Sequence, residues 1–385
     1  MIELGLLKRR AGFKDVYRFL GIDVAIRSDD RRLLDDFRKV YRRFAIEDSS
    51  SEKLSFWILS AAAGPGRCCL IAGEKLFVLE SPAVVPHLYF FLFNFITEEV
   101  RDYFIIHAGV VALGGRGILV SAPSMVGKTT LIFSLVLKGF EFLSDELAPI
   151  HRKSLLIEPF PRSIGLRFRA LALFPGLKER AKGLVTVETP EESKVMVDVE
   201  AEGLARVAGP CRPAVVIFLE PQLEQQDGEP SHRYLELSLN TLPDAFLGKL
   251  RTIPGVVDAA RLADRDIPTC RLTLEKKARI VKELDSLCAA EGILVSRSIP
   301  GATRPPDYSR PPALRPIEKK EGLLELARNL QGGPQSKLFE AHGGSPSRLL
   351  FELAEVARDV DFFAMRVGRL EEMTDLIWEL ARRKT

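Results

Sequence analysis

The sequence is poor in cysteine and has no apolar run long enough to cross a membrane. Its five cysteines form an odd set without CxxC spacing or a nearby pair of histidines, so we expect neither a zinc site nor a disulfide framework. The longest apolar run, Leu88 to Ile96, is interrupted by Asn94 and is much shorter than a membrane span. No apolar segment follows the basic residues near Met1, so no secretion signal is expected. These absences predict a cytoplasmic protein without a membrane partner.

A strong excess of one charge is also missing. The formal net charge is only +3 over 385 residues, and the basic side chains are scattered among nearly as many acids. No basic stripe with interleaved aromatics is present, so nucleic acid is not an expected partner. The hydrophobic fraction of 46% and the charged fraction of 28% are typical of a folded protein and argue against disorder. The length predicts two or three compact units and leaves a homo-oligomer open.

The most informative stretch runs from Ile118 to Glu146. A short apolar strand leads into APSMVGKT, which fills the phosphate-loop pattern GxxxxGK(S/T) except that Ala122 stands where glycine is usual. The apolar spacing after Thr129 predicts a helix that ends at Gly139. Such a loop directs backbone N–H groups and the positive end of the helix dipole at phosphate groups. The residues expected to bind the cofactor ATP are Ser124, Met125, Val126, Gly127, Lys128, Thr129 and Thr130.

An acidic pair follows the next predicted strand, Phe140 to Ser144. Asp145 and Glu146 stand at its carboxyl end, beside the loop. Carboxylates in this place bind Mg²⁺ or take the proton from an attacking hydroxyl. The predicted metal ligands are therefore Thr129, Asp145 and Glu146. We expect Lys128 to reach the β and γ phosphate oxygens.

Two further polar residues flank this stretch. His107 lies within the predicted strand Ile105 to Leu113, where a lone histidine is either a core residue or part of the neighbouring site. Arg162 follows Pro161, with Pro159 just before it, so a stiff backbone would fix the direction of its guanidinium. Arg162 is either a cation directed at a transferred phosphoryl group or one half of a surface ion pair.

The rest of the chain divides around this centre. We predict an N-terminal α/β domain over 1–98, a phosphate-loop domain over 99–296, a Pro/Arg-rich linker over 297–318 and a mostly helical region over 319–385. The aromatic cluster of Val85 to Phe95 is interpreted as packing between domains. Ala170 to Val197 is expected to be a charged helical insertion where a peptide or protein acceptor could dock. Leu274 to Glu291 is expected to be helical, and Ala214 to Leu219 to be a buried strand of the central sheet.

The segments HAGVVALGGRGILVSAPSMVGKTTL, LKGFEFLSDELAPI and EPFPRSIGLR together resemble the HPr kinase/phosphorylase-like family, especially its kinase-related branch. The resemblance is close over Ile105 to Arg169. It implies an α/β fold whose phosphate-loop domain is akin to the phosphoenolpyruvate carboxykinase core and has a twisted mixed sheet. It also implies that Lys128 and Thr129 bind ATP and Mg²⁺ and that Asp145 activates the acceptor hydroxyl. His107 falls at the family's histidine before the loop. The candidate catalytic residues are therefore Asp145, His107 and Arg162.

The sequence departs from the family at several positions. Thr130 stands where the HPr kinase itself usually has glutamate, and no PGRN-like segment of the phosphorolysis activity is present. A bifunctional enzyme acting on HPr is therefore not expected. The absence of an NKxD-like segment argues against a GTPase.

Three functions remain open from the sequence. The first is an ATP- and Mg²⁺-dependent kinase that phosphorylates a Ser or Thr hydroxyl of a peptide or small protein. The second is a nucleotide-binding accessory or scaffold protein of a biosynthetic cluster, without phosphate transfer. The third is a small-molecule kinase that uses the same site.

Overall fold

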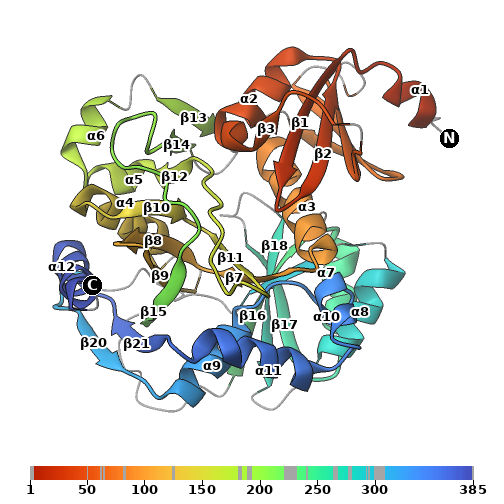
Figure 1. Cartoon of the computed structure of the whole chain (residues 1–385). Coiled ribbons are helices and arrows are strands. Elements are labelled where there is room, and N and C mark those ends of the chain that lie inside the picture. The colour runs from red at the N-terminus through yellow and green to blue at the C-terminus, as the bar shows by residue number, and fades with distance from the viewer. Residues whose placement is uncertain are drawn as a thin grey trace.

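The computed structural model describes residues 4–49, 51–60, 63, 66–80, 84–123, 126–180, 184–188, 193–220, 232–239, 242–262, 268–275, 280–291, 293, 295–298 and 308–383. It is a mixed α/β protein with several sheets, two of which combine parallel and antiparallel strands. Figure 1 shows the N-terminal sheet at the upper right, α9 and α11 along the lower edge, and α12 at the left.

The N-terminal unit is a six-stranded sheet with helices packed against it. Its elements are α1 (Leu4–Lys8), β1 (Phe13–Phe19), β2 (Ile22–Ser28), α2 (Arg31–Tyr41), the short 3₁₀ helix η1 (Arg42–Phe44), β3 (Ala45–Ile46), β4 (Leu54–Leu59), β5 (Arg67–Ala72), β6 (Lys75–Glu80) and α3 (Val84–Glu99). The strand order is β3-β1-β2-β4-β5-β6, and only β2 and β4 run parallel. Strands and helices alternate in this unit, as the α/β prediction for the N-terminal region expects.

Residue alternation explains why this sheet is covered on both faces. Cys68 and Leu70 of β5 point to the large core shared with α2 and α3, whereas Cys69 and Ile71 belong to a small cluster with Leu4 and Leu7 around α1. Successive side chains of a strand face opposite sides, so β5 needs an apolar cover on each. All the cysteines are free and buried.

The central unit contains a second six-stranded sheet. Its elements are β7 (Tyr103–His107), β8 (Gly109–Leu113), β9 (Arg116–Ser121), α4 (Lys128–Lys138), β10 (Glu141–Ser144), β11 (Leu147–His151), β12 (Ile164–Arg167), α5 (Phe168–Leu171), α6 (Pro175–Arg180), β13 (Val185–Glu188), β14 (Ser193–Val197) and β15 (Arg212–Glu220). The sheet has the order β10-β8-β9-β15-β21-β20, with β9, β15 and β21 parallel. Strands β7 and β11 pair separately, and β12, β14 and β13 form a small sheet.

The C-terminal part of the chain completes this sheet. Its elements are β20 (Ala313–Pro316), α9 (Lys319–Arg328), α10 (Lys337–Ala341), α11 (Pro346–Ala357), β21 (Asp361–Arg366) and α12 (Leu370–Arg382). Strand β21 pairs in parallel with the buried strand β15, as Val215 opposite Asp361 shows. The predicted C-terminal region, 319–385, thus supplies a strand to the sheet that carries the phosphate-loop sequence.

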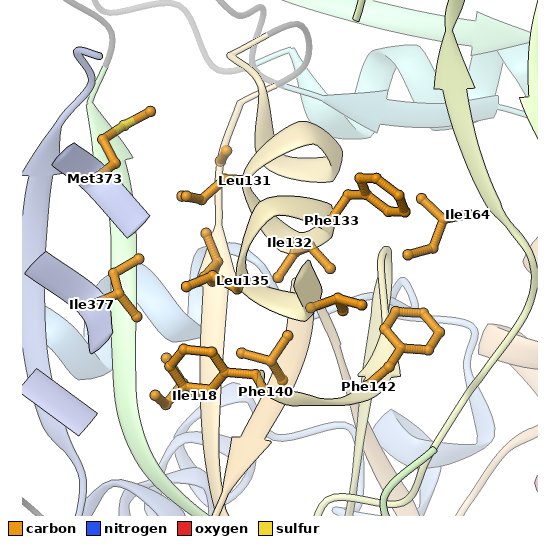
Figure 2. Packing of buried hydrophobic residues seen from close by; sticks show 14 of the residues in the cluster. Ile118, Leu131, Ile132, Phe133, Leu135, Phe140, Phe142, Ile164, Met373 and Ile377 are labelled. Atoms are coloured by element: carbon orange, nitrogen blue, oxygen red, sulfur yellow. The ribbon is translucent and has the colours of Figure 1, made fainter. Parts of the chain in front are cut away.

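Two apolar cores sandwich the central sheet. On one face, α4 and α12 pack over β9 and β15, and Figure 2 shows the α4 side chains between Met373 and Ile377 of α12 and Ile164 of β12. On the other face, residues of α9 and α11 cover Leu119 and Val216. A strand that is apolar on both faces is typical of the middle of such a sheet. This confirms the prediction that Ala214 to Leu219 belongs to the central sheet.

A third set of strands has a core of its own. The elements are β16 (His232–Leu239), α7 (Asp244–Leu250), β17 (Val256–Leu262), β18 (Thr269–Glu275), α8 (Val281–Ala290) and β19 (Val295–Ser298). The strands form an antiparallel sheet in the order β17-β18-β16-β19, and α7 and α8 contribute to its core.

Several predicted elements differ from the structure. The single strand predicted over Ile105 to Leu113 is two strands, because the chain leaves the β7–β11 pair at Ala108 and enters the central sheet at Gly109. A Cβ atom on Gly109 would lie 2.5 Å from the side chain of Ile132, so glycine allows α4 to pack close at this crossing.

The helical prediction for Ala170 to Val197 is wrong over its second half. Val185–Glu188 and Ser193–Val197 form the antiparallel hairpin β13–β14. Both segments contain β-branched residues at alternate positions, Val185 and Val187 in one and Val195 and Val197 in the other, and such residues favour a strand when β14 can pair with β12.

Two further predictions need correction. The helix predicted to begin at Leu274 begins at Val281, because Leu272 and Leu274 alternate into the core as part of β18. In the predicted linker, 299–307 lies outside the described residues, whereas Ala313–Pro316 is an edge strand of the central sheet. Proline is tolerated at a sheet edge because no ladder hydrogen bond is needed on the open side.

Of the helices that the structure describes, none combines the length and the apolar character that crossing a bilayer requires.

Candidate functional site

The phosphate-loop sequence lies at the carboxyl end of the parallel strands. Strand β9 ends at Ser121, and α4 begins at Lys128 after Gly127, whose φ of 91° is left-handed. This conformation is costly for any residue with a Cβ atom and accounts for the glycine. Ligands of open α/β sheets bind at this edge, and the α4 N-terminus supplies N–H groups and a positive dipole. Val126 points its side chain into the core, so only its backbone can face a ligand.

Five of the seven predicted cofactor-binding positions lie among the described residues. Ser124 and Met125 lie outside the described residues, whereas Thr129 and Thr130 are in the first turn of α4 and are half-buried. Tyr308, which the sequence analysis did not select, lies over the loop: a Cβ atom on Gly127 would be 3.2 Å from its hydroxyl.

Lys128 is held by a histidine instead of a carboxylate. Its Nζ atom is 3.0 Å from Nε2 of His107, and no ion pair to Lys128 occurs among the described residues. Burial, together with the charge of Lys128, lowers the pKa of His107 to about 3, so the imidazole is neutral and accepts the hydrogen bond. Burial also lowers the pKa of Lys128 to about 8. The ammonium group is thus oriented but not neutralised.

The backbone turn after β10 brings the two acids together. The Ser144 hydroxyl accepts hydrogen bonds from the N–H groups of Glu146, at 3.1 Å, and Leu147, at 3.0 Å. Such a serine turn reverses the chain at the strand end. Asp145 is only 1% exposed, whereas Glu146 keeps a quarter of its side chain exposed.

Arg162 joins both carboxylates. Its Nε atom donates to Asp145 at 3.0 Å, its Nη2 atom donates to the second Asp145 oxygen at 3.2 Å, and Nη2 also pairs with Glu146. Arg162 does form an ion pair, but its side chain is 16% exposed, so the pair is largely buried and not at the surface. A bidentate pair in a buried site has a fixed geometry.

The two carboxyl groups differ in their protonation. Burial, supported by the charge of Glu146, raises the pKa of Asp145 even though Arg162 opposes the rise. For Glu146, burial acts in the same upward direction, but Arg162 and Lys128 outweigh it and lower the pKa to about 2. Glu146 is therefore a permanent anion, and Asp145 has the raised basicity that suits proton transfer.

The N-terminal unit fixes the segment that carries Arg162. The Ser163 N–H donates to the Val40 carbonyl at 3.0 Å, and the Ser163 hydroxyl donates to the Lys39 carbonyl at 3.2 Å. The Arg162 guanidinium lies 4.9 Å from the centre of the Tyr89 ring, which stacks on Tyr41. A cation above an aromatic face is attracted by it. The predicted packing between domains at the aromatic cluster is thus a contact with the candidate site.

The comparisons with known proteins add little to this geometry. Among solved structures, the chain is similar to the Hpr(Ser) kinase/phosphatase from Coxiella burnetii. The match has a TM-score of 0.20 and 16% sequence identity, and it covers 34% of this chain and 70% of that chain. A likeness at that TM-score carries no argument. No protein-family model and no curated protein matches the chain.

Sequence reasoning missed the residues that support the site from distant segments. The Asn329 carbonyl, at the end of α9, accepts the backbone N–H of His107 at 2.8 Å. The Ser121 hydroxyl lies 2.9 Å from Oδ1 of Asn329 and 3.0 Å from the His107 carbonyl. Asn329 follows an ordinary helical pattern, and no local signal marks it. For Tyr89, the density of aromatics was the available signal.

The residues present fit a magnesium nucleotide. Among the described residues, no group of three or more metal-binding side chains occurs, and Mg²⁺ bound with a nucleotide needs only one or two carboxylates beside the phosphates. Glu146, with its lowered pKa, supplies a permanent anion near Lys128. Phosphates would meet the uncapped N-terminus of α4 and the oriented Lys128.

Proposed function

We propose that the protein is an ATP- and Mg²⁺-dependent kinase that transfers the γ-phosphoryl group to a Ser or Thr hydroxyl of a peptide or small protein. One observation carries the proposal: an oriented lysine, a buried aspartate with a raised pKa and an arginine meet beside an uncapped helix N-terminus. The resemblance of the loop and acidic-pair motifs to the HPr kinase/phosphorylase-like family supports the same activity.

Each residue has a distinct part in the proposed reaction. Lys128 and the N–H groups of the α4 N-terminus bind the phosphates, and neutral His107 directs the lysine without competing for its charge. Asp145 takes the proton of the acceptor hydroxyl, and Arg162 stabilises the negative charge of the transferred group. Thr129, Asp145 and Glu146 would hold Mg²⁺, which supplies charge neutralisation at the phosphates when bound.

The carboxylates must first be released from Arg162. In the free protein, both Asp145 and Glu146 are bonded to the guanidinium. A bound phosphoryl group offers Arg162 another anion, so nucleotide binding gives the arginine a second partner and frees Asp145 for the acceptor.

The test compares Asp145→Asn with Glu141→Gln, a carboxylate of the same strand β10 outside the site. We expect Asp145→Asn to retain ATP binding, through Lys128 and the N-terminus of α4, but to lose about 10²–10⁴-fold in the transfer rate to a library of Ser- and Thr-containing peptides. Glu141→Gln should retain both properties. A wild-type transfer rate in Asp145→Asn would show that the base is assigned to the wrong residue.

The accessory function is favoured by one observation, the double engagement of Arg162 with the acidic pair. If Arg162 stays bonded to both Asp145 and Glu146 when nucleotide is bound, the protein binds ATP without transferring phosphate. Nucleotide binding by the wild type, together with no phosphorylated peptide and no ATP consumption, would select this function.

A further inference from the structure

The hydroxyl of Tyr89 is buried and has no hydrogen-bond partner among the described residues. Nearly all buried polar groups in folded proteins are hydrogen-bonded, because an unpaired one loses its hydration without compensation. Tyr89 belongs to α3 of the N-terminal unit, yet its ring lies 4.9 Å from the Arg162 guanidinium. The unpaired hydroxyl therefore belongs to a side chain that packs on the N-terminal core and also contacts the candidate site.

The surroundings of this hydroxyl define what it can bind. A phenolic hydroxyl is protonated at neutral pH, so the Tyr89 group is a hydrogen-bond donor. The Glu146 carboxylate lies near the hydroxyl, but the two groups do not meet hydrogen-bond geometry. Tyr41 stacks behind the ring, with the ring centres 6.0 Å apart and the planes at 16°. A hydrogen-bond donor and a cation, Arg162, thus lie together beside Glu146, and both can bind an anionic oxygen.

We propose that the Tyr89 hydroxyl is a catalytic residue that donates a hydrogen bond to an oxygen of the transferred phosphoryl group. The inference rests on the proposed kinase function and extends it, because it places a reacting-group contact in the N-terminal unit. In the reaction, the bond between the γ phosphorus and the bridging oxygen breaks, and a bond from the acceptor oxygen forms. The acceptor proton goes to Asp145, and ADP leaves with the bridging oxygen. Tyr89 keeps its proton throughout.

The experiment compares two identical substitutions in the same unit. Tyr89→Phe removes the unpaired hydroxyl and keeps the ring beside Arg162. Tyr17→Phe is the matched control, because Tyr17 is also buried in this unit but its hydroxyl has a partner, Asp15, at 3.3 Å. Titration calorimetry measures the affinities of each protein for Mg²⁺ with ADP and for Mg²⁺ with a non-transferable imido analogue of ATP.

We expect Tyr89→Phe to lose about 5- to 50-fold of the preference for the ATP analogue over ADP and about 10²-fold of the transfer rate. Its melting temperature should equal or exceed that of the wild type, because the substitution removes an unpaired buried group. Tyr17→Phe should keep the preference and the rate while its melting temperature falls. A purely structural tyrosine would not combine lower activity with undiminished stability.

The outcomes separate the inference from the proposed function. If the wild type binds neither nucleotide, the proposed function fails and the inference with it. If the wild type prefers the ATP analogue and Tyr89→Phe keeps that preference, the inference alone is overturned. The same holds if Tyr89→Phe loses as much stability as Tyr17→Phe, because its hydroxyl is then satisfied within the folded protein. If the wild type binds both nucleotides without transferring phosphate, Tyr89 has no catalytic part and the accessory function stands.

Discussion

The two six-stranded sheets use their charged residues in opposite ways. In the N-terminal sheet, buried acids have arginines of the same unit as partners: Asp15 pairs with Arg31 at 2.7 Å, and Asp23 with Arg18 at 2.6 Å. Beside the central sheet, the one hydrogen-bond partner of Lys128 among the described residues is a neutral imidazole, and Arg162 is shared between two carboxylates. Charges that are fully paired stabilise a fold, whereas incompletely paired charges in a buried place mark a binding site.

The same contrast holds for two helices that follow a strand. Helix α2 comes after β2, and its N-cap, Asp30, accepts the N–H of Arg32 at 2.9 Å. Helix α4 comes after β9, and its N-cap, Gly127, has no side chain to cap it. The protein's own carboxylate thus satisfies the N-terminus of α2, and the N-terminus of α4 is left for an external anion.

The largest effect should come from removing the shared arginine. Arg162→Met leaves two buried carboxylates without their cation, which we expect to cost about 3–5 kcal/mol of the free energy of unfolding. Adding Asp145→Asn should restore part of this loss. The matched Arg18→Met variant should be affected much less, because Arg18 is half-exposed and Asp23 keeps the Ser49 hydroxyl as a donor. The free energy of unfolding of each variant is measured by denaturant titration. An equal loss in Arg162→Met and Arg18→Met would contradict the difference between the two sheets.

Removing the lysine should affect nucleotide binding and not folding. We expect Lys128→Ala to weaken Mg²⁺–ATP binding by about 10- to 100-fold, through loss of a charge-assisted hydrogen bond to phosphate. Lys138→Ala, at the other end of α4, is the control, because it removes only a half-exposed pair with Asp375. Binding is measured by titration calorimetry. An equal affinity in the two variants would show that the phosphates do not reach Lys128.

The lowered pKa of Lys128 predicts a pH dependence. Above pH 8 the free protein loses the lysine proton, so phosphate binding must take one up, and the affinity should fall by up to about tenfold per pH unit. Proton uptake at pH 8.5 is measured by calorimetry in buffers of different ionisation enthalpy. The unfolded chain keeps this proton up to its ordinary pKa of 10.5, so Lys128 makes folding more favourable as the pH rises from 8 to 10.5. An affinity independent of pH would contradict the assignment.

The smallest effect concerns the capped helix. Asp30→Ala should lower the free energy of unfolding by about 1 kcal/mol, because the N–H groups of the first α2 turn lose their acceptor. Nucleotide binding should not change. Asp36→Ala, which removes an exposed pair with Lys39, is the control and should be nearly neutral. A change in nucleotide affinity in Asp30→Ala would contradict the conclusion that only the N-terminus of α4 binds the nucleotide.

Local patterns predicted much of the fold. Apolar periodicity and an end signal located α4 with Gly139, and apolar runs located β9 and β15. The hairpin β13–β14 and the split between β7 and β8 were missed, because they depend on which neighbour the chain meets. Sequence cannot show such tertiary contacts through propensity alone.

The sequence predicted which residues form the candidate site better than it predicted the interactions between them. Lys128, His107, Asp145, Glu146 and Arg162 lie together, as the motifs indicated, while their catalytic roles stay predictions. The order of their protonation could not be predicted, because it depends on burial and on distances between segments.

The place of β21 has a consequence for how the protein folds. Strand β15 lies between β9 and β21, and its Val215 pairs with Asp361, very far along the chain. Pairs so distant in sequence form slowly, because a long loop must close before any contact compensates for the lost entropy. The N-terminal sheet, whose strands are near neighbours, can form during synthesis. We therefore expect the central sheet to assemble late and a ribosome-bound chain without β21 to lack a working nucleotide site.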